Sequence, residues 1–220
     1  MELAEAIKAR KSIRGFRPQP VPKPVIEAIL ELAARSPSWS NTQPWEVTII
    51  GGEVMAEVKA ALVQAVASGT PAAPDIPLPG FAEPYLTRRR DLGIKLYQAL
   101  DISREDRAAR ETWSLQGYRF FEAPNGLIFC LDAALDEWSV LDLGLFLQSV
   151  MLAALSFGLG TCATATVVHY PNVLRQILGI PERQKIICGM AMGYPDWQHP
   201  ANKIESQRET VASFTRWCGF

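Results

Sequence analysis

The chain has 220 residues, 48% of them hydrophobic and 20% charged, a composition typical of a globular protein large enough for one sizeable core. Its 22 basic and 23 acidic residues give a formal net charge of -1, which argues against nucleic acid or an anionic membrane surface as a partner. The four cysteines lie far apart, mostly in apolar runs, and indicate buried free thiols in a reducing cytoplasm.

The first third of the chain predicts three helices and a strand. Helical periodicity opens the sequence at residues 3–10 and returns at residues 24–33, where Pro24 suits a first helical turn. Residues 45–50, WEVTII, are typical of a strand that ends at two glycines, and residues 53–66 predict a third helix.

The middle of the chain is less regular. Residues 69–84 are rich in Pro, Gly and Ala and predict an irregular surface loop, and the Arg-heavy segment 85–113 predicts a helix with breaks. Residues 126–132, GLIFCLD, predict a buried strand. Residues 137–160 predict a helix that is apolar nearly all round, which belongs in a core or a subunit interface.

Two further strands are predicted at residues 161–168 and 185–194, and the last residues show little periodicity. Helices interleaved with about four buried strands indicate a single domain over residues 1–220, with an α+β or three-layer arrangement. The apolar residues of the tail, about 196–220, need cover, either from the chain's own core or from a partner subunit.

Neither a membrane span nor a metal site is expected. The apolar stretch at 138–157 is interrupted by Asp142 and falls short of the ~20 apolar residues that a spanning helix needs. The N-terminal residues lack the apolar core of a signal peptide, and neither His169 nor His199 has metal-ligand spacing. A cytoplasmic location is therefore expected.

Gly158, Gly160 and Ala163 match the spacing of a dinucleotide-binding fingerprint, but a helix ends there and a strand begins. Glycine that closes a helix is the commoner explanation, so no Rossmann site is predicted. The run Arg88–Arg90 is balanced by nearby acids and is expected to form a solvated helix face.

Two polar segments each allow two interpretations. In RKSIRGFR, basic side chains either suit the end of a helix or form a fork of guanidinium groups that grips a phosphate; composition alone favours the helix end. In SPSWSNTQPW, the short polar groups either satisfy their own loop or wrap a flat ligand with many edge donors and acceptors; the indoles of Trp39 and Trp45 favour the ligand.

Four other residues are also ambiguous. Asp142 suits the first turn of its helix, but it is equally a candidate ligand contact. Trp113, Tyr85 and Phe81 either line a pocket or take part in ordinary packing.

Taken together, these segments resemble the FMN-dependent nitroreductases. The matching motifs are RKSIRGF, SPSWSNTQPWEVTII, the apolar helix that ends in GLGTCA, and ICGMAMGYP. The resemblance covers nearly the whole chain and is weakest around residues 69–120. It implies an α+β homodimer with a three-layer fold, in which helices surround a mixed, mostly antiparallel sheet. It also implies two FMN sites at the dimer interface and a tail that extends over the partner.

The resemblance implies roles for particular residues. The RKSIR segment would hold the phosphate, ribityl chain and pyrimidine edge of FMN, and the partner's SWSN loop would lie against the same flavin, whose apolar faces stack on aromatic rings. The implied cofactor-binding residues are Arg10, Lys11, Ser12, Arg14, Ser38, Trp39, Ser40, Asn41, Asp142, Ala163, Thr164, Ala165, Thr166 and Arg208. The implied acceptor pocket includes Trp39, Tyr85 and Trp113.

The activity that the resemblance implies is the reduction of nitroaromatic compounds by NAD(P)H through FMN, with ping-pong turnover, hydride transfer through flavin N5 and quinones as secondary acceptors. No side chain is expected to act as a catalytic acid or nucleophile, because the flavin carries the chemistry. Alternatives are an ene-reductase, a quinone reductase or a reductive dehalogenase on the same fold, and a non-catalytic flavin carrier or sensor. Residues 163–166, ATAT, replace a Pro-x-Glu-Gly stretch of the enteric branch, and the sequence is more similar to the branch that acts on nitroaromatic acids.

Overall fold

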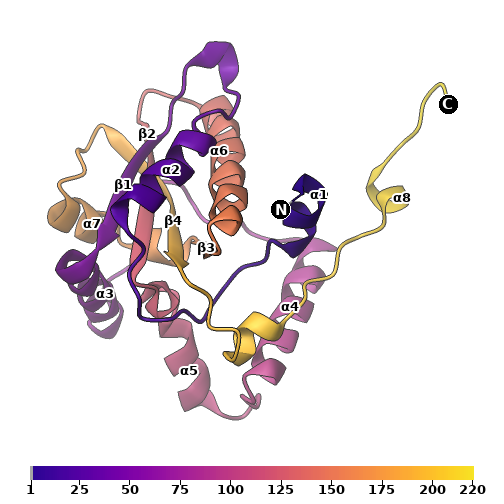
Figure 1. The fold of residues 1–220 in the computed structure, drawn as a ribbon. Coiled ribbons are helices and arrows are strands. Elements are labelled where there is room, and N and C mark those ends of the chain that lie inside the picture. Colours follow the sequence, from indigo (N-terminus) through magenta and orange to yellow (C-terminus); the bar gives the residue numbers. More distant parts are fainter. Residues whose placement is uncertain (1) are drawn as a thin grey trace.

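In the computed structural model, which describes residues 2–220, four strands form one sheet in the order β1-β2-β4-β3 (Figure 1). The strands are β1 (Glu46–Gly51), β2 (Asn125–Asp132), β3 (Gly160–Thr164) and β4 (Gln184–Gly193). Every ladder is antiparallel, and an isolated parallel bridge joins Ser12 to Thr161. The α+β prediction is confirmed.

Helices cover both faces of this sheet. On one face lie α2 (Lys23–Ala33) and α6 (Glu137–Ser156), and on the other lie α3 (Gly52–Ala67) and α7 (Pro171–Leu178). The alternation of side chains along a strand explains the two cores. In β2, Leu127, Phe129 and Leu131 belong to the core beneath α2 and α6, and Ile128 and Cys130 belong to the opposite one. The three-layer prediction is confirmed.

Four further helices and four short turns complete the part of the chain that the structure describes. They are the helices α1 (Leu3–Ala9), α4 (Tyr85–Ala99), α5 (Arg107–Leu115) and α8 (Val211–Phe214), and the short 3-10 turns η1 (Trp39–Asn41), η2 (Phe120–Glu122), η3 (Thr166–His169) and η4 (Pro200–Lys203). In Figure 1 the C-terminal segment passes α4 and then extends away from the body of the molecule. The predicted break in the 85–113 helix lies between α4 and α5.

One prediction around β3 is wrong in extent, and one helix was missed. The strand predicted at 161–168 ends at Thr164, because residues 166–169 turn away from the sheet as η3. Helix α7 was not predicted, although the sequence marks both of its ends. Pro171 occupies its first position, where a missing N–H costs nothing, and Gly179 closes it with a left-handed φ of 66°.

Among residues 2–220, α6 is the one helix long and apolar enough to span a membrane by length and composition, and a core helix passes the same test. Phe146 and Val150 on one side of α6 are buried against the sheet. Leu141 and Leu145 on another side are 55% and 42% exposed. The helix therefore presents apolar surface beyond what its own chain covers.

Candidate functional site

A cavity of about 1140 Å³ lies between the segment that follows α1, helix α4 and the C-terminal segment. Its charged lining consists of seven cations and two carboxylates: Arg10, Lys11, Arg14, Arg88, Arg89, Lys95, Arg208, Asp91 and Glu209. Ser12 also lines it. The structure thus brings together all four predicted residues of the RKSIR segment and Arg208, which lies almost two hundred residues away in the sequence. The excess of positive charge favours an anionic ligand.

Most of these cations have few partners within the chain. Arg88 Nε donates to Glu209 Oε1 at 2.9 Å, and Arg208 Nη1 donates to Ser206 Oγ at 2.7 Å. The side chains of Arg10 and Arg89 have no hydrogen bond or ion pair with any residue of the 2–220 range. Guanidinium groups without carboxylate partners are suited to bidentate binding of a phosphate.

The segment that carries Arg10 to Arg14 is fixed on both sides. The N–H of Ile13 donates to the carbonyl of Thr161 on β3 at 2.9 Å. On the other side the N–H of Arg14 donates to Asn202 Oδ1 at 2.7 Å, and the buried Asn202 amide donates to the carbonyl of Gly15 at 2.7 Å. Asn202 was not predicted as a site residue, and no local motif marks it.

Gly15 permits this close approach. A Cβ atom built on Gly15 would lie 2.2 Å from Cγ of His199, so any other residue would push the segment away from η4. The glycine in RKSIRG is therefore a packing requirement that positions the basic side chains on either side of it.

The predicted stretch Ala163–Thr166 follows the strand to which this segment is bonded. Ala163 and Ala165 are exposed and Thr164 is buried, and the N–H of Thr166 donates to Thr164 Oγ1 at 3.2 Å. Strand β3 also fixes Ser12 and Ile13 through Thr161, so this stretch lies close in sequence to the anchor of the RKSIR segment. The contact of Ala163–Thr166 with FMN that the family resemblance implies remains a prediction.

Phe121 is an aromatic neighbour of the cavity that sequence reasoning missed. Its ring lies 5.8 Å from the guanidinium carbon of Arg14 and 6.3 Å from the ring of Trp113. Phe120, Phe121 and Glu122 have left-handed φ angles of 52°, 53° and 57°. Such a turn costs about 1–2 kcal/mol per residue, and strain of this kind gathers at ligand sites.

The three residues of the predicted acceptor pocket do not lie together in one chain. Trp113 lies between Phe121 and His199, with a ring distance of 6.2 Å to His199. Tyr85 begins α4 and is exposed, and Arg88 lies 5.6 Å from the centre of its ring. Trp39 belongs to a different end of the molecule.

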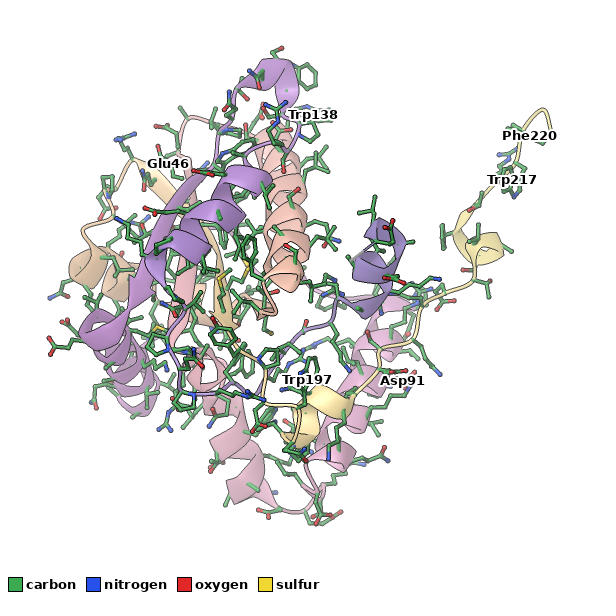
Figure 2. All side chains as sticks on the ribbon, viewed as in Figure 1. Glu46, Asp91, Trp138, Trp197, Trp217 and Phe220 are labelled. Atoms are coloured by element: carbon green, nitrogen blue, oxygen red, sulfur yellow. The ribbon has the colours of Figure 1, made fainter. Side chains whose placement is uncertain are left out.

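The loop Ser38–Asn41 and Asp142 lie at the N-terminal end of α6. Trp39 and Trp138 have ring centroids 5.3 Å apart, and Asp142 Oδ2 accepts the Trp39 N–H at 3.0 Å. In Figure 2, Trp138 lies at the upper end of the molecule, well apart from Asp91 of the cavity. In one chain, the loop residues and Asp142 therefore do not line the cavity.

The titratable groups near the cavity do not form a nucleophile-base pair. Burial raises the pKa of the Cys162 thiol, and burial raises the pKa of Tyr118 to about 12. Tyr118 is hydrogen-bonded to Nδ1 of His169 at 2.8 Å, and burial lowers the pKa of that histidine. Within residues 2–220 no cluster of three His, Cys, Asp or Glu side chains could hold a metal ion. The arrangement favours anion binding and positioning.

The chain is similar to known proteins over nearly its whole length. A family model described as the nitroreductase family matches residues 7–194. The 4-nitrobenzoate reductase of Pseudomonas putida is 36% identical over 216 residues, 97% of this chain and 94% of that protein. The nitrobenzene nitroreductase of Ectopseudomonas oleovorans is 37% identical over 215 residues, 96% of this chain and 94% of that protein. The crystal structure of an FMN and NADPH-dependent nitroreductase, NfnB from Sphigopyxis sp. strain HMH, matches with a TM-score of 0.97 and 31% identity, covering 100% of both chains.

Proposed function

The chain belongs to the nitroreductase family, and we propose from this premise that it reduces nitroaromatic compounds with NAD(P)H as the electron donor and FMN as the cofactor. The observation that carries the proposal is the cationic cavity. Its cations come from the RKSIR segment, from α4 and from the C-terminal segment, and they converge on one volume of about 1140 Å³. A phosphate-bearing ligand fits such a site, whereas a metal ion does not.

The residues around the cavity offer the kinds of chemical group that the parts of FMN require. Arg10, Lys11 and Arg208 offer donors to its phosphate, and Ser12 offers a hydroxyl to the ribityl chain. The backbone of the exposed Ala163 and Ala165 and the ring of Phe121 would offer a polar edge and an apolar surface to the isoalloxazine. When bound, FMN supplies two-electron chemistry between NAD(P)H and the acceptor, and the protein supplies binding and orientation.

A second copy of the chain completes this site in our proposal. The Ser38–Asn41 loop does not line the cavity of its own chain, so it reaches a flavin only in a partner subunit. The exposed leucines of α6 supply apolar surface for a dimer interface. The C-terminal segment exposes Phe214, Trp217 and Phe220, and Figure 2 shows Trp217 and Phe220 far from the body of the chain. This segment would extend over the partner.

We further propose ping-pong turnover in the cytoplasm. No second nucleotide-binding domain is present in residues 2–220, so the nicotinamide and the acceptor would use the same open face in turn. The cations near the flavin would favour its anionic reduced form. The acceptor pocket would be lined by Trp113 and Tyr85 of one chain and Trp39 of the partner.

Steady-state kinetics test the proposal. Purified protein loaded with FMN should oxidise NADPH or NADH when 4-nitrobenzoate or nitrobenzene is present, with parallel lines in double-reciprocal plots. If turnover on an activated alkene or a halophenol exceeds turnover on both nitroarenes, the physiological acceptor is not a nitroarene and the proposed substrate class is wrong. Tight FMN binding without steady-state NAD(P)H oxidation would instead indicate a flavin carrier.

A further inference from the structure

One face of α6 contacts the loop at residues 36–43, which follows α2. Trp138, Asp142 and Ser149 are spaced by four and seven residues and therefore share that face. Each contacts the loop: the Trp138 ring lies 5.3 Å from the Trp39 ring, and Asp142 Oδ2 accepts the Trp39 N–H at 3.0 Å. The Ser36 hydroxyl donates to Ser149 Oγ at 2.7 Å. The loop is thus held at three successive heights along one helix.

The Asp142 carboxylate is the central contact. It is only 6% exposed, and it is the one charged side chain of α6 beyond the helix's first residue. A buried carboxylate is costly unless it accepts hydrogen bonds. Among residues 2–220 the Trp39 N–H is the hydrogen-bond donor that the structure gives to this side chain. The bond to the Trp39 N–H therefore explains the placement of this carboxylate more directly than the dipole of α6 does.

The loop beyond this contact has a strained backbone. Ser40, Asn41 and Gln43 have left-handed φ angles of 49°, 58° and 48°, and none of them is glycine. The N–H of Gln43 donates to Ser38 Oγ at 2.9 Å, which closes the loop on itself. Residues in such conformations persist only where surrounding contacts over-determine them, and they cluster at ligand sites. The side chains of Trp138, Asp142 and Ser149 on α6 supply those contacts.

We propose that Asp142 is a positioning residue that fixes the Trp39 loop in its binding conformation before any ligand arrives, and that Trp138 extends the indole surface that Trp39 presents. This inference rests on the proposed function, in which the loop lies against the flavin and acceptor of the partner subunit. Asp142 then affects acceptor binding through the loop, since the hydrogen bond that its carboxylate accepts among residues 2–220 comes from the Trp39 N–H. Pre-organisation of this kind reduces the free energy that ordering costs when a ligand binds.

Three variants separate positioning from mere stability. Asp142→Ala removes the acceptor of the Trp39 N–H, and Asp142→Asn retains an oxygen that accepts it in the same place. The matched control is Asp136→Ala, which removes another carboxylate that accepts a backbone N–H on the same helix. Asp136 caps α6 and accepts the Trp138 N–H at 3.2 Å, and within residues 2–220 it makes no hydrogen bond to the loop.

The first measurement is circular dichroism of the flavin-free protein. Two indoles at this distance, with ring planes inclined by 55°, should give an exciton couplet in the far ultraviolet. Trp39→Leu and Trp138→Leu should each abolish the couplet, which assigns it to this pair. Asp142→Ala should weaken it strongly, whereas Asp142→Asn and Asp136→Ala should retain it. An unchanged couplet in Asp142→Ala would overturn the proposal.

The second measurement is the split between KM and kcat for the nitroarene. Asp142→Ala should raise the acceptor KM about tenfold with little change in kcat, because a displaced loop misplaces one wall of the pocket. Asp142→Asn should stay within about threefold of the wild type, since a neutral acceptor keeps roughly half the strength of a charged one. A fall in kcat at constant KM, equal in Asp142→Ala and Asp136→Ala, would show a merely structural role and overturn the proposal.

The two measurements also separate this inference from the proposed function. The couplet is read without FMN, NAD(P)H or acceptor, so it tests the grip of α6 even if the protein proves to be a flavin carrier. Normal nitroarene turnover together with an unchanged KM in Asp142→Ala would overturn the positioning role and leave the proposed function intact.

Discussion

Arg175 and the arginines of the cationic cavity differ in their partners. Arg175, on α7, is nearly buried and donates to both oxygens of Asp75 at 3.1 and 2.6 Å and to the carbonyl of Gln184 at 2.8 Å. Arg10 and Arg89, in the cationic cavity, have no such partner among residues 2–220. Both terminal nitrogens of Arg175 are hydrogen-bonded within the fold, and its Nε lies 3.6 Å from Glu182, whereas the cavity arginines are arranged around a volume that the fold leaves open.

The difference shows how to distinguish a structural arginine from a binding one. Asp75 also accepts the N–H of Ile186, so its carboxylate ties the irregular 69–84 loop to both α7 and β4. The contact with Asp75 raises the pKa of Arg175, which reflects a pair that stabilises the folded chain. The cavity cations repel one another unless an anion is bound, so their contribution appears in ligand affinity and not in stability.

The largest expected effect is on FMN affinity when the cavity loses charge. Arg10→Ala combined with Lys11→Ala should weaken FMN binding at least about 100-fold, since each charge-assisted hydrogen bond to a phosphate contributes about 1.5–3 kcal/mol. Flavin fluorescence quenching measures the affinity. The free energy of unfolding without FMN should change by less than about 0.5 kcal/mol. Arg35→Ala, which removes one exposed arginine outside the cavity, is the control to be compared with Arg10→Ala alone, and an equal loss of affinity in these two single variants would contradict a local site.

Removing the partner of Arg175 should have the opposite result, a loss of stability with almost unchanged FMN affinity. Asp75→Ala leaves Arg175 without its principal partner and should lower the free energy of unfolding by about 3 kcal/mol, which chemical denaturation measures. FMN affinity, determined well below the unfolding transition, should stay within about twofold of the wild type. A large loss of FMN affinity in still-folded Asp75→Ala protein would show that the two arginine groups are not independent.

The smallest expected effect is on the pH dependence of stability, to which the histidines contribute and the arginines do not. Arginine keeps its charge throughout the range in which proteins are usually studied, so a change of stability at mildly acidic pH must come from other groups. Burial lowers the pKa of His169, so the unfolded chain binds its proton first. The contribution of His169 to stability should be complete above its ordinary pKa of 6.5 and be lost as the pH falls through the lower folded value. His169→Gln should flatten the dependence of unfolding free energy on pH in that window. An unchanged slope would show that other groups cause the pH dependence.

Much of the fold could be predicted because its elements have strong local patterns. The sequence predicts β2 and α6 from their long, mostly apolar runs, and the broken helix at 85–113 from its composition. The missed helix α7 has only eight residues, too few for a convincing helical period, although Pro171 and Gly179 marked its ends. The strand before it was extended too far because Val167 and Val168 look like strand residues, yet both are buried in a 3-10 turn.

The site was less predictable because its contacts are distant in sequence. The RKSIR segment and Arg208 could be named from family motifs, but Arg88 and Arg89 were expected on a solvated face. Only the folded chain places these α4 arginines opposite Arg10. Asn202, which fixes Arg14 across 188 residues, has no local signature. For Asp142 the family resemblance implies a flavin contact, which stays a prediction, and the structure adds a bond to the Trp39 backbone that the sequence does not indicate.

Subunit complementation tests most directly whether the cavity of one chain and the loop of its partner form a single site. Arg10→Ala/Lys11→Ala protein lacks a working cavity, and Trp39→Ala/Asn41→Ala protein lacks a working loop, so each should reduce a nitroarene poorly alone. After the two are mixed and their subunits exchange, half of the dimers are hybrids with one intact site, and activity should recover to about a quarter of the wild type. A mixture no more active than the average of its two parents would contradict the shared site.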